Sequence, residues 1–177
     1  MQITCAARNA LGWVVPMNIT DLFDVLDALQ SAETPCWVAG GWGVDVLVGR
    51  QTREHRDVDL ALDAAKETEA LRALEALGYC IETDQRPARV ELAAPGRRWA
   101  DLHPVVFDDE GVGRQADLQG GFFVYPPDAF VTGTFQGRSI PCLSVSQQLA
   151  FRCGYTLRDV DRHDIAQLQG LSGRRQD

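Results

Sequence analysis

Residues 36–43 read CWVAGGWG, and residues 57–59 read DVD. The apolar half of the first stretch predicts a buried strand, and its two glycines predict a tight turn at the end of that strand. A helical pattern follows from residue 42 to residue 48, and Gly49 is placed to cap it. This order puts a glycine turn between a strand and the start of a helix, shortly before a pair of carboxylates.

Asp57 and Asp59 open a second predicted strand, which covers residues 58–63. Residues two apart on a strand point to the same face, so the two carboxylates lie side by side. Such a pair is electrostatically costly unless a cation lies between them, and Mg²⁺ prefers oxygen ligands and retains phosphates in its shell. The pair indicates a site for one or two Mg²⁺ ions, although surface strands often carry this pattern without a metal.

Gly40 and Gly41 bear on the same chemistry. Glycines between a strand and a helix let backbone amides approach a phosphate closely, and the helix dipole favours an anion there. A glycine pair alone indicates only a turn. Its position on the strand before the carboxylate pair favours a nucleotide phosphate site.

A third carboxylate would complete a metal site, and two residues are candidates. Asp101 lies between apolar neighbours in a predicted strand over residues 99–107, and Glu91 does so in one over residues 89–93. Either side chain could face the metal or point to solvent, and the pattern does not choose between them.

Gly-Gly, Asp-x-Asp and a lone carboxylate on a later strand resemble the pattern of the polymerase-beta-like nucleotidyltransferases. Residues 37–45, 53–59 and 101–104 are more closely similar to the lincosamide nucleotidyltransferases, and more distantly to the aminoglycoside 2″-nucleotidyltransferase. The resemblance covers about residues 20–170 and leaves out both ends of the chain. It implies an α+β fold, with a small mixed sheet flanked by helices and a short C-terminal helical part.

The resemblance also implies an activity. This is Mg²⁺-dependent transfer of AMP, from ATP or another nucleoside triphosphate, to a hydroxyl of a lincosamide antibiotic, which inactivates it. Asp57 and Asp59 would bind the metal, two ions in all, while Gly40 and Gly41 would hold the nucleotide phosphates. Asp101, by its position before a His-Pro pair, would be the general base or a third metal ligand.

Side chains around these motifs are further candidates. A cation just before the aspartates could bind the β- and γ-phosphates, and Trp42 could stack on the nucleotide or pack in the core. The predicted nucleotide contacts are Gly40, Gly41, Trp42, Arg53, His55 and Arg56. The predicted acceptor contacts are Arg89, Glu91, His103 and Tyr125, with Glu91 also the alternative base.

The remaining pattern completes a small mixed α/β domain. Helices are predicted over residues 20–31, with Thr20 as N-cap, over residues 66–77 and 144–153, and from residue 159 or 161 to residue 168. Further strands are predicted over residues 79–83, 122–125, 131–135 and 138–142. We expect residues 1–17 to be a disordered leader, residues 18–110 the nucleotidyltransferase core, and residues 111–177 the strands and helices that complete the acceptor site.

The chain has 177 residues, 45% of them hydrophobic, and a net charge of −8, which indicates one folded domain with an acidic surface. Because duplex nucleic-acid binders present a basic face, no nucleic-acid partner is expected.

The five cysteines show no CxxC spacing, which excludes a zinc ribbon and favours buried thiols in a reducing compartment. No stretch approaches the roughly 20 apolar residues of a membrane helix, so we expect a cytoplasmic protein without a membrane partner. The resemblance implies a homodimer.

Three alternatives remain open. The acceptor could be an aminoglycoside, although its several positive charges would call for an unusually acidic pocket. The chain could be a non-catalytic binding or antitoxin-type protein, but Asp57, Asp59 and Asp101 are all present. A nucleic-acid-modifying transferase is the third, and the acidic balance argues against it.

Overall fold

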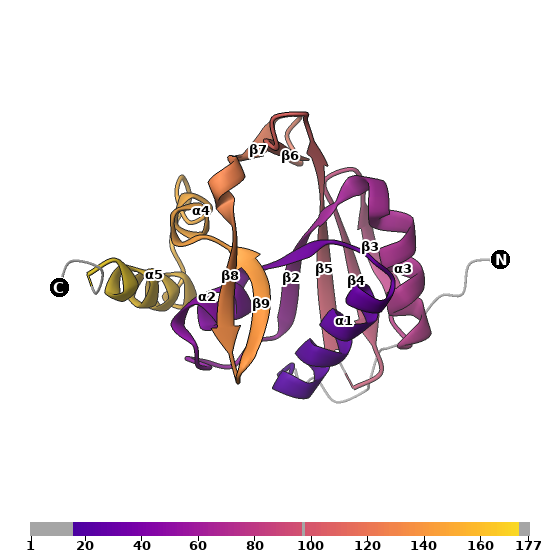
Figure 1. Cartoon of the computed structure of the whole chain (residues 1–177), viewed down its shortest axis with the longest axis horizontal. Coiled ribbons are helices and arrows are strands. Elements are labelled where there is room, and N and C mark those ends of the chain that lie inside the picture. The colour runs from indigo at the N-terminus through magenta and orange to yellow at the C-terminus, as the bar shows by residue number, and fades with distance from the viewer. Residues whose placement is uncertain (1–15, 97, 174–177) are drawn as a thin grey trace.

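The computed structural model describes residues 16–96 and 98–173 (Figure 1). Its helices are α1 (Ile19–Ser31), α2 (Gly40–Val48), α3 (Glu67–Ala76), α4 (Val145–Ala150) and α5 (Asp159–Gly173), with short 3-10 helices η1 (Ala64–Lys66) and η2 (Pro127–Ala129). Its strands are β1 (Cys36–Ala39), β2 (Asp57–Asp63), β3 (Cys80–Gln85), β4 (Arg89–Ala94), β5 (Arg98–Phe107), β6 (Gly113–Ala116), β7 (Phe122–Tyr125), β8 (Phe130–Phe135) and β9 (Arg138–Leu143).

The first helix is capped by Asn18 rather than by Thr20. The Asn18 side chain accepts a hydrogen bond from the Asp21 amide at 3.0 Å, and the Asp21 carboxylate accepts one from the Asn18 amide at 3.2 Å. This reciprocal capping box needs its two members three residues apart, which Asn18 and Asp21 satisfy. The prediction of Thr20 as N-cap was therefore wrong.

Met17 belongs to the folded domain, although we expected it to end the leader. Its side chain is buried in the main core, and its amide donates a hydrogen bond to the His55 carbonyl oxygen at 2.7 Å. The rest of the expected leader, residues 1–15, lies outside the described residues.

The strands form one mixed sheet in the order β3-β4-β5-β2-β1-β9-β8. β2 runs parallel to β5, β1 runs parallel to β9, and the other neighbours in this order are antiparallel. β6 and β7 form a hairpin that continues from the end of β5 and projects at the top of Figure 1. The α+β fold with a mixed sheet, which the resemblance implies, is confirmed.

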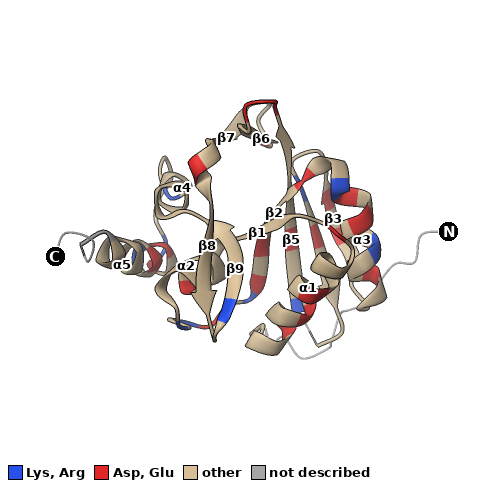
Figure 2. Cartoon of the chain, in the orientation of Figure 1, with Lys and Arg blue, Asp and Glu red and all other residues tan. Residues whose placement is uncertain are grey.

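Alternation along the central strands separates an apolar face of the sheet from a polar one. Val58, Leu60 and Leu62 of β2 are fully buried in a core that also contains residues of α1, α2 and α3. Asp57 and Asp59 point to the other face. Figure 2 shows acidic residues on the central strands as well as along α1 and α3. The first three helices therefore cover one face and leave the acidic face to the hairpin and α4.

Three elements differ from the prediction. β6 was missed because its sequence, Gly-Arg-Gln-Ala, has little strand preference of its own; pairing with β5 and β7 makes it a strand. α4 ends at Ala150, and α5 continues beyond residue 168.

The cysteines agree with the prediction in part. Cys142 is buried as expected, whereas Cys153, just past the end of α4, is exposed. Within the described part of the chain, no helix has the length and apolar character needed to cross a membrane.

Candidate active site

A row of carboxylates crosses three neighbouring strands. Asp59 on β2 is in register with Asp101 on the parallel strand β5, and Glu91 on β4 lies opposite Asp101 on its other side. Asp57 lies two residues before Asp59 and therefore on the same face. The structure thus brings the predicted pair together with both candidates for the third carboxylate.

The centre of this row fits a divalent cation. Ligand atoms of Asp59, Asp101 and His103 lie within 4.8 Å of one another. The Oδ1 atom of Asp101 is buried and has no hydrogen-bond partner within the described residues, and a buried carboxylate oxygen without a partner is what a hard cation would satisfy. Asp57 lies outside this group, and its carboxylate accepts a hydrogen bond from Arg56 Nε at 2.9 Å. A guanidinium therefore balances Asp57 in this structure.

The crowding of these carboxylates moves their pKa values in different directions. Burial raises the pKa of Asp101 to about 6, with His103 opposing the shift and Asp59 adding to it. Burial and repulsion from Asp59 also raise the pKa of Asp57, against the effect of Arg56. Burial alone would raise the pKa of Asp59, but the hydrogen bond and charge of His103 lower it. Burial thus gives Asp101 the raised pKa that suits a general base, whereas His103 favours the charged form of Asp59.

Arginine side chains form ion pairs with the carboxylates at the edge of the row. Arg89 Nη1 lies 3.2 Å from Asp101 Oδ2, and Arg89 Nη2 lies 3.2 Å from Glu91 Oε2. Arg56 Nη2 lies 3.3 Å from the same Glu91 oxygen. Because Glu91 faces two guanidinium groups, the geometry favours an ion-pairing role for it over proton acceptance, and Asp101 is the better candidate base.

His103 connects the row to the hairpin. Its Nε2 lies 3.4 Å from Asp59 Oδ1, and its Nδ1 lies 3.0 Å from the amide nitrogen of Gln115 on β6. Tyr125 on β7 is buried, and its hydroxyl donates to the Gln115 amide oxygen. No sequence pattern pointed to Gln115, because its contact with His103 exists only through the unpredicted strand β6.

The glycine turn lies directly against the carboxylates. Gly40 has φ +56°, and a Cβ atom added there would come within 1.9 Å of Asp59 Oδ2. A Cβ atom at Gly41 would come within 2.3 Å of Arg53 Nη2 and 2.4 Å of His55 Nδ1. Ala39 caps α2 without a side-chain hydrogen bond, so amides at this helix N-terminus face the site without a capping side chain. Only glycine fits both positions.

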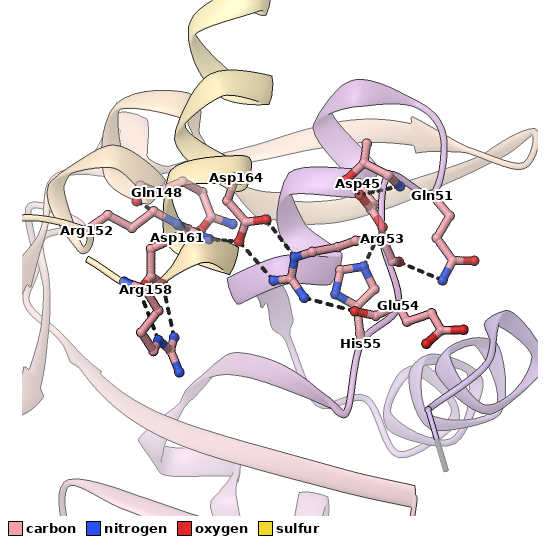
Figure 3. A network of polar contacts seen from close by, with 11 residues as sticks. Asp45, Gln51, Arg53, Glu54, His55, Gln148, Arg152, Arg158, Asp161 and Asp164 are labelled. Carbon is pink, nitrogen blue, oxygen red and sulfur yellow. Dashed lines mark hydrogen bonds and ion pairs between the residues drawn. The ribbon is translucent and has the colours of Figure 1, made fainter. Parts of the chain in front are cut away.

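A network of polar side chains, shown in Figure 3, packs against this turn through Arg53 and His55. Asp164 of α5 accepts hydrogen bonds from Arg53 Nε at 2.8 Å and from Arg152 Nη2 at 2.8 Å. Asp45 of α2 accepts one from the Thr52 hydroxyl at 2.6 Å and lies 2.5 Å from His55 Nε2. The network therefore joins α2, the loop before β2, the segment just after α4, and α5.

Two of the predicted nucleotide contacts are core residues instead. Trp42 is fully buried, and its ring packs against the His55 ring with centroids 4.4 Å apart. His55 is only 2% exposed and is bound to Asp45. Since neither side chain can reach a ligand from these positions, we correct their assignment from nucleotide contact to support of the glycine turn. Arg53 lies behind the same turn, bound to Asp164.

A cavity of about 250 Å³ opens beside the row. Aromatic side chains, cationic side chains and members of the carboxylate row share its wall. It is lined by Ala39, Gly40, Asp59, His103, Gln115, Phe123, Tyr125, Gln148, Phe151, Arg152, Tyr155, Arg158 and Asp161. Of the predicted acceptor contacts, His103 and Tyr125 line this cavity, whereas Arg89 and Glu91 do not. Contact of either pair with an acceptor stays a prediction. The C-terminal strands and helices were expected to complete the acceptor site, but the residues that α4, α5 and the segment between them contribute were not named, because they depend on how these helices pack.

Residues 21–168 match a family model described as aminoglycoside-2″-adenylyltransferase. The chain is 40% identical over 157 residues to a lincosamide resistance protein of Staphylococcus haemolyticus, covering 88% of this chain and 98% of that protein. It is 30% identical over 127 residues to a 2″-aminoglycoside nucleotidyltransferase of Klebsiella pneumoniae, covering 72% of this chain and 68% of that protein.

Solved structures agree with these relatives. The crystal structure of the lincomycin-bound lincosamide antibiotic adenylyltransferase LnuA matches with a TM-score of 0.81 and 38% identity, covering 89% of this chain and 99% of that one. The solution structure of the antibiotic-resistance factor ANT(2″)-Ia matches with a TM-score of 0.71 at 19% identity, over 90% of this chain and 88% of that one, which shows the fold alone.

The fold and its row of carboxylates define a nucleotidyltransferase. The chain belongs to the aminoglycoside-2″-adenylyltransferase family, and among its relatives the lincosamide resistance protein is more similar to it than the aminoglycoside nucleotidyltransferases. The predicted family is confirmed, and so is the prediction that the chain is more similar to lincosamide enzymes than to the aminoglycoside enzymes.

Proposed function

We propose that this protein transfers AMP from ATP to a hydroxyl group of a lincosamide antibiotic and thereby inactivates it. The main support is the arrangement of Gly40, Asp59 and His103 around one cavity, with Asp101 next in the row. The 40% identity to a lincosamide resistance protein supports the choice of acceptor.

In the proposed reaction, Asp57 and Asp59 would hold magnesium, two ions in all, and the charge that magnesium supplies would offset that of the triphosphate. Asp101 accepts the proton of the acceptor hydroxyl. The freed oxygen attacks the α-phosphorus in line, the bond from that phosphorus to the bridging oxygen breaks, and pyrophosphate leaves. Amides of Gly40 and Gly41 hold phosphate oxygens at the start of α2.

The segment between α4 and α5 supplies the positive charge near the phosphates in this proposal. Arg152 and Arg158 line the same cavity as Gly40, and the charge of Arg152 helps to lower the pKa of Asp59, after the effects of burial and of His103. Arg53 and Arg56, which we predicted as phosphate contacts, are bound to Asp164 and Asp57. For Arg56, a phosphate contact stays a prediction that requires its release from Asp57.

An aminoglycoside acceptor is the second candidate, because the matching family model is described by that activity. The cavity argues for the lincosamide. Its wall contains as many arginines as aspartates, so it lacks the acidic excess that a polycation calls for. The aromatic rings of Phe123, Phe151 and Tyr155 on the same wall suit an acceptor with apolar surface.

The test is a measurement of pyrophosphate release from metal-stripped protein with ATP, lincomycin and added Mg²⁺. We expect release only when protein, Mg²⁺ and lincomycin are all present, and a lower kcat/KM with tobramycin in place of lincomycin. A higher kcat/KM with tobramycin would leave the chemistry intact and reverse the choice of acceptor. Release that is equally fast after EDTA treatment would remove the metal from the proposal.

We also propose a homodimer. Val106, Arg114 and Val124 are in cross-strand register on the outer face of the hairpin, and Phe122 extends this face. Val106 and Phe122 are 63% and 64% exposed, which is unusual for side chains of this kind. Light scattering after size-exclusion chromatography should give twice the chain mass, and Phe122→Lys should give the monomer mass.

A further inference from the structure

The side-chain amide of Gln115 has only one orientation that satisfies its neighbours. Its nitrogen donates a hydrogen bond to the Ala88 carbonyl oxygen at 3.2 Å, and its oxygen accepts one from the Tyr125 hydroxyl. A backbone carbonyl can only accept, so the amide nitrogen must face Ala88. Turning the amide over would set two acceptors against each other in a buried place, because Gln115 is only 7% exposed.

This orientation determines where the proton of His103 lies. The second N–H of the Gln115 amide faces His103 Nδ1 at 3.0 Å, so Nδ1 must accept a hydrogen bond. A proton on Nδ1 would oppose that N–H group. In the neutral ring, the proton therefore lies on Nε2, which faces two acceptors, Asp59 Oδ1 at 3.4 Å and Asp101 Oδ2 at 3.8 Å.

We propose that Gln115 is a positioning residue that locks His103 in the tautomer protonated at Nε2, and that His103 consequently serves as a hydrogen-bond donor and not as a metal ligand. A histidine nitrogen needs its lone pair to bind a metal ion, and at Nε2 the proton occupies it. His103 is nevertheless one of three residues whose ligand atoms cluster within 4.8 Å. The lock leaves the cation to the carboxylates Asp57, Asp59 and Asp101.

The lock has a consequence for the reaction, and this part rests on the proposed function. The Nε2–H group of His103 lies between Asp59 and Asp101 at the wall of the cavity. From there it can donate to a phosphate oxygen that gains negative charge during transfer, which is where a fixed donor accelerates a reaction most. A ring free to exchange tautomers would offer that donor only part of the time.

Nitrogen-15 NMR of the histidine rings tests the lock without nucleotide or antibiotic. The chain has three histidines, so the spectrum is simple, and His103→Gln identifies the signals of His103. At a pH where the ring is neutral, we expect a protonated Nε2 and an unprotonated Nδ1 in a single tautomer. A protonated Nδ1 would overturn the proposal. Because Zn²⁺ prefers imidazole ligands, titration with Zn²⁺ should leave the Nε2 proton in place, and its loss would contradict the donor role.

Gln115→Met removes the amide donor while keeping a side chain of similar length. We expect the Nδ1 signal to move toward that of free imidazole, kcat to fall at least about tenfold, and KM for ATP to change less than about twofold. Gln119→Met, at an exposed position in the turn of the same hairpin, is the matched control and should change none of these. Unchanged His103 signals in folded Gln115→Met would overturn the assignment.

Gln115→Asn is the second variant, for the case in which Gln115→Met does not fold. Its amide remains polar but is one methylene shorter, and so cannot bond Ala88 and His103 together. The same signal change is expected. If His103 of the wild-type protein shows the Nε2 tautomer but the protein transfers no AMP, the lock stands and the proposed function fails. If the protein transfers AMP but His103 does not show this tautomer, the function stands and the lock fails.

Discussion

At the scale of single residues, the site consists of carboxylates that are costly to hold together. Asp57 and Asp59 share one face of β2, and Asp101 lies beside Asp59 on β5. Asp57→Asn and Asp59→Asn each keep the shape of the side chain and remove the charge. We expect either change to lower the transfer rate at least about 100-fold with an unchanged circular dichroism spectrum. Activity close to wild type in either folded variant would contradict the metal site.

We expect Asp101 to be required for the reaction while lowering the stability of the folded protein at neutral pH. Its pKa is raised to about 6 by burial, so above pH 6 the folded protein holds a charged group at a cost that the unfolded chain does not bear. Asp101→Asn should abolish transfer and yet raise Tm at pH 7.5, by about 2–4 °C for each kcal/mol recovered. Because wild-type Asp101 is protonated in both states at low pH, the gain should vanish below about pH 4. A Tm that falls at pH 7.5 would show that the ion pair with Arg89 outweighs the burial cost.

Glu91→Gln is the companion variant at the alternative base. Glu91 faces Arg56 and Arg89, so we expect the variant to keep a kcat within about tenfold of wild type, with its larger effect on KM for the acceptor. If Glu91→Gln loses turnover and Asp101→Asn retains it, the base has been assigned to the wrong strand.

Gly40 tests the close approach of the turn to the metal site. Gly40→Ala adds a Cβ atom within 1.9 Å of Asp59 Oδ2 at a φ of +56°. Gly137→Ala is the matched control, because φ there is +75° and nothing lies within 4 Å of the added atom. Both variants should lose about 1 kcal/mol from backbone strain, and only Gly40→Ala should also lose ATP binding by calorimetry. Equal ATP affinity in the two would remove the turn from the nucleotide site.

The sequence was sufficient at this scale for the residues of the row and the turn. Two aspartates two apart on a strand, together with glycines between a strand and a helix, indicate a metal and phosphate site far more strongly than either pattern does alone. It was insufficient for Trp42 and His55, because sequence proximity to the turn does not say whether a side chain lies in front of it or behind it. Gln115 could not be found at all, since its role depends on an amide orientation that only the packed hairpin sets.

At the scale of elements, α5 supports the site from a distance in sequence. Asp164 bonds Arg53, in the loop before β2, and Arg152, beyond α4, and it is only 2% exposed. Asp164→Asn should cost about 3–5 kcal/mol in the free energy of unfolding, because the buried guanidinium of Arg152 and the partly buried one of Arg53 lose their carboxylate. Asp159→Asn, in the exposed first turn of the same helix, is the control and should cost less than about 1 kcal/mol by urea denaturation. Similar costs for the two would mean that the network contributes little to the fold.

Most elements were predictable because their signals are local. Gly49 and Gly78 end α2 and α3 in the left-handed conformation that their positions suggested. β6 and the far end of α5 were not predicted. β6 could not be, because it is a strand only through its pairing with β5 and β7. These missed parts belong to the hairpin and the C-terminal helices, which enclose the cavity. The acidic face of the sheet was therefore predicted better than the cavity beside it.

At the scale of the whole molecule, the separation of the two faces of the sheet explains how one small domain can hold a reactive site. Helices α1, α2 and α3 supply the main core on one face, so the acidic face needs only a hairpin and a short helix to shape a cavity. The net charge of −8 fits this arrangement, because carboxylates lie on the sheet and over the outer helices alike.

The proposed AMP transfer is tested by incubating the protein with ATP, Mg²⁺ and clindamycin or lincomycin and weighing the antibiotic by mass spectrometry, with Asp59→Asn in parallel. We predict that the wild-type protein adds one AMP group to the antibiotic and that the variant adds none. An unmodified lincosamide, after incubation with folded wild-type protein that binds ATP, would contradict the proposed function.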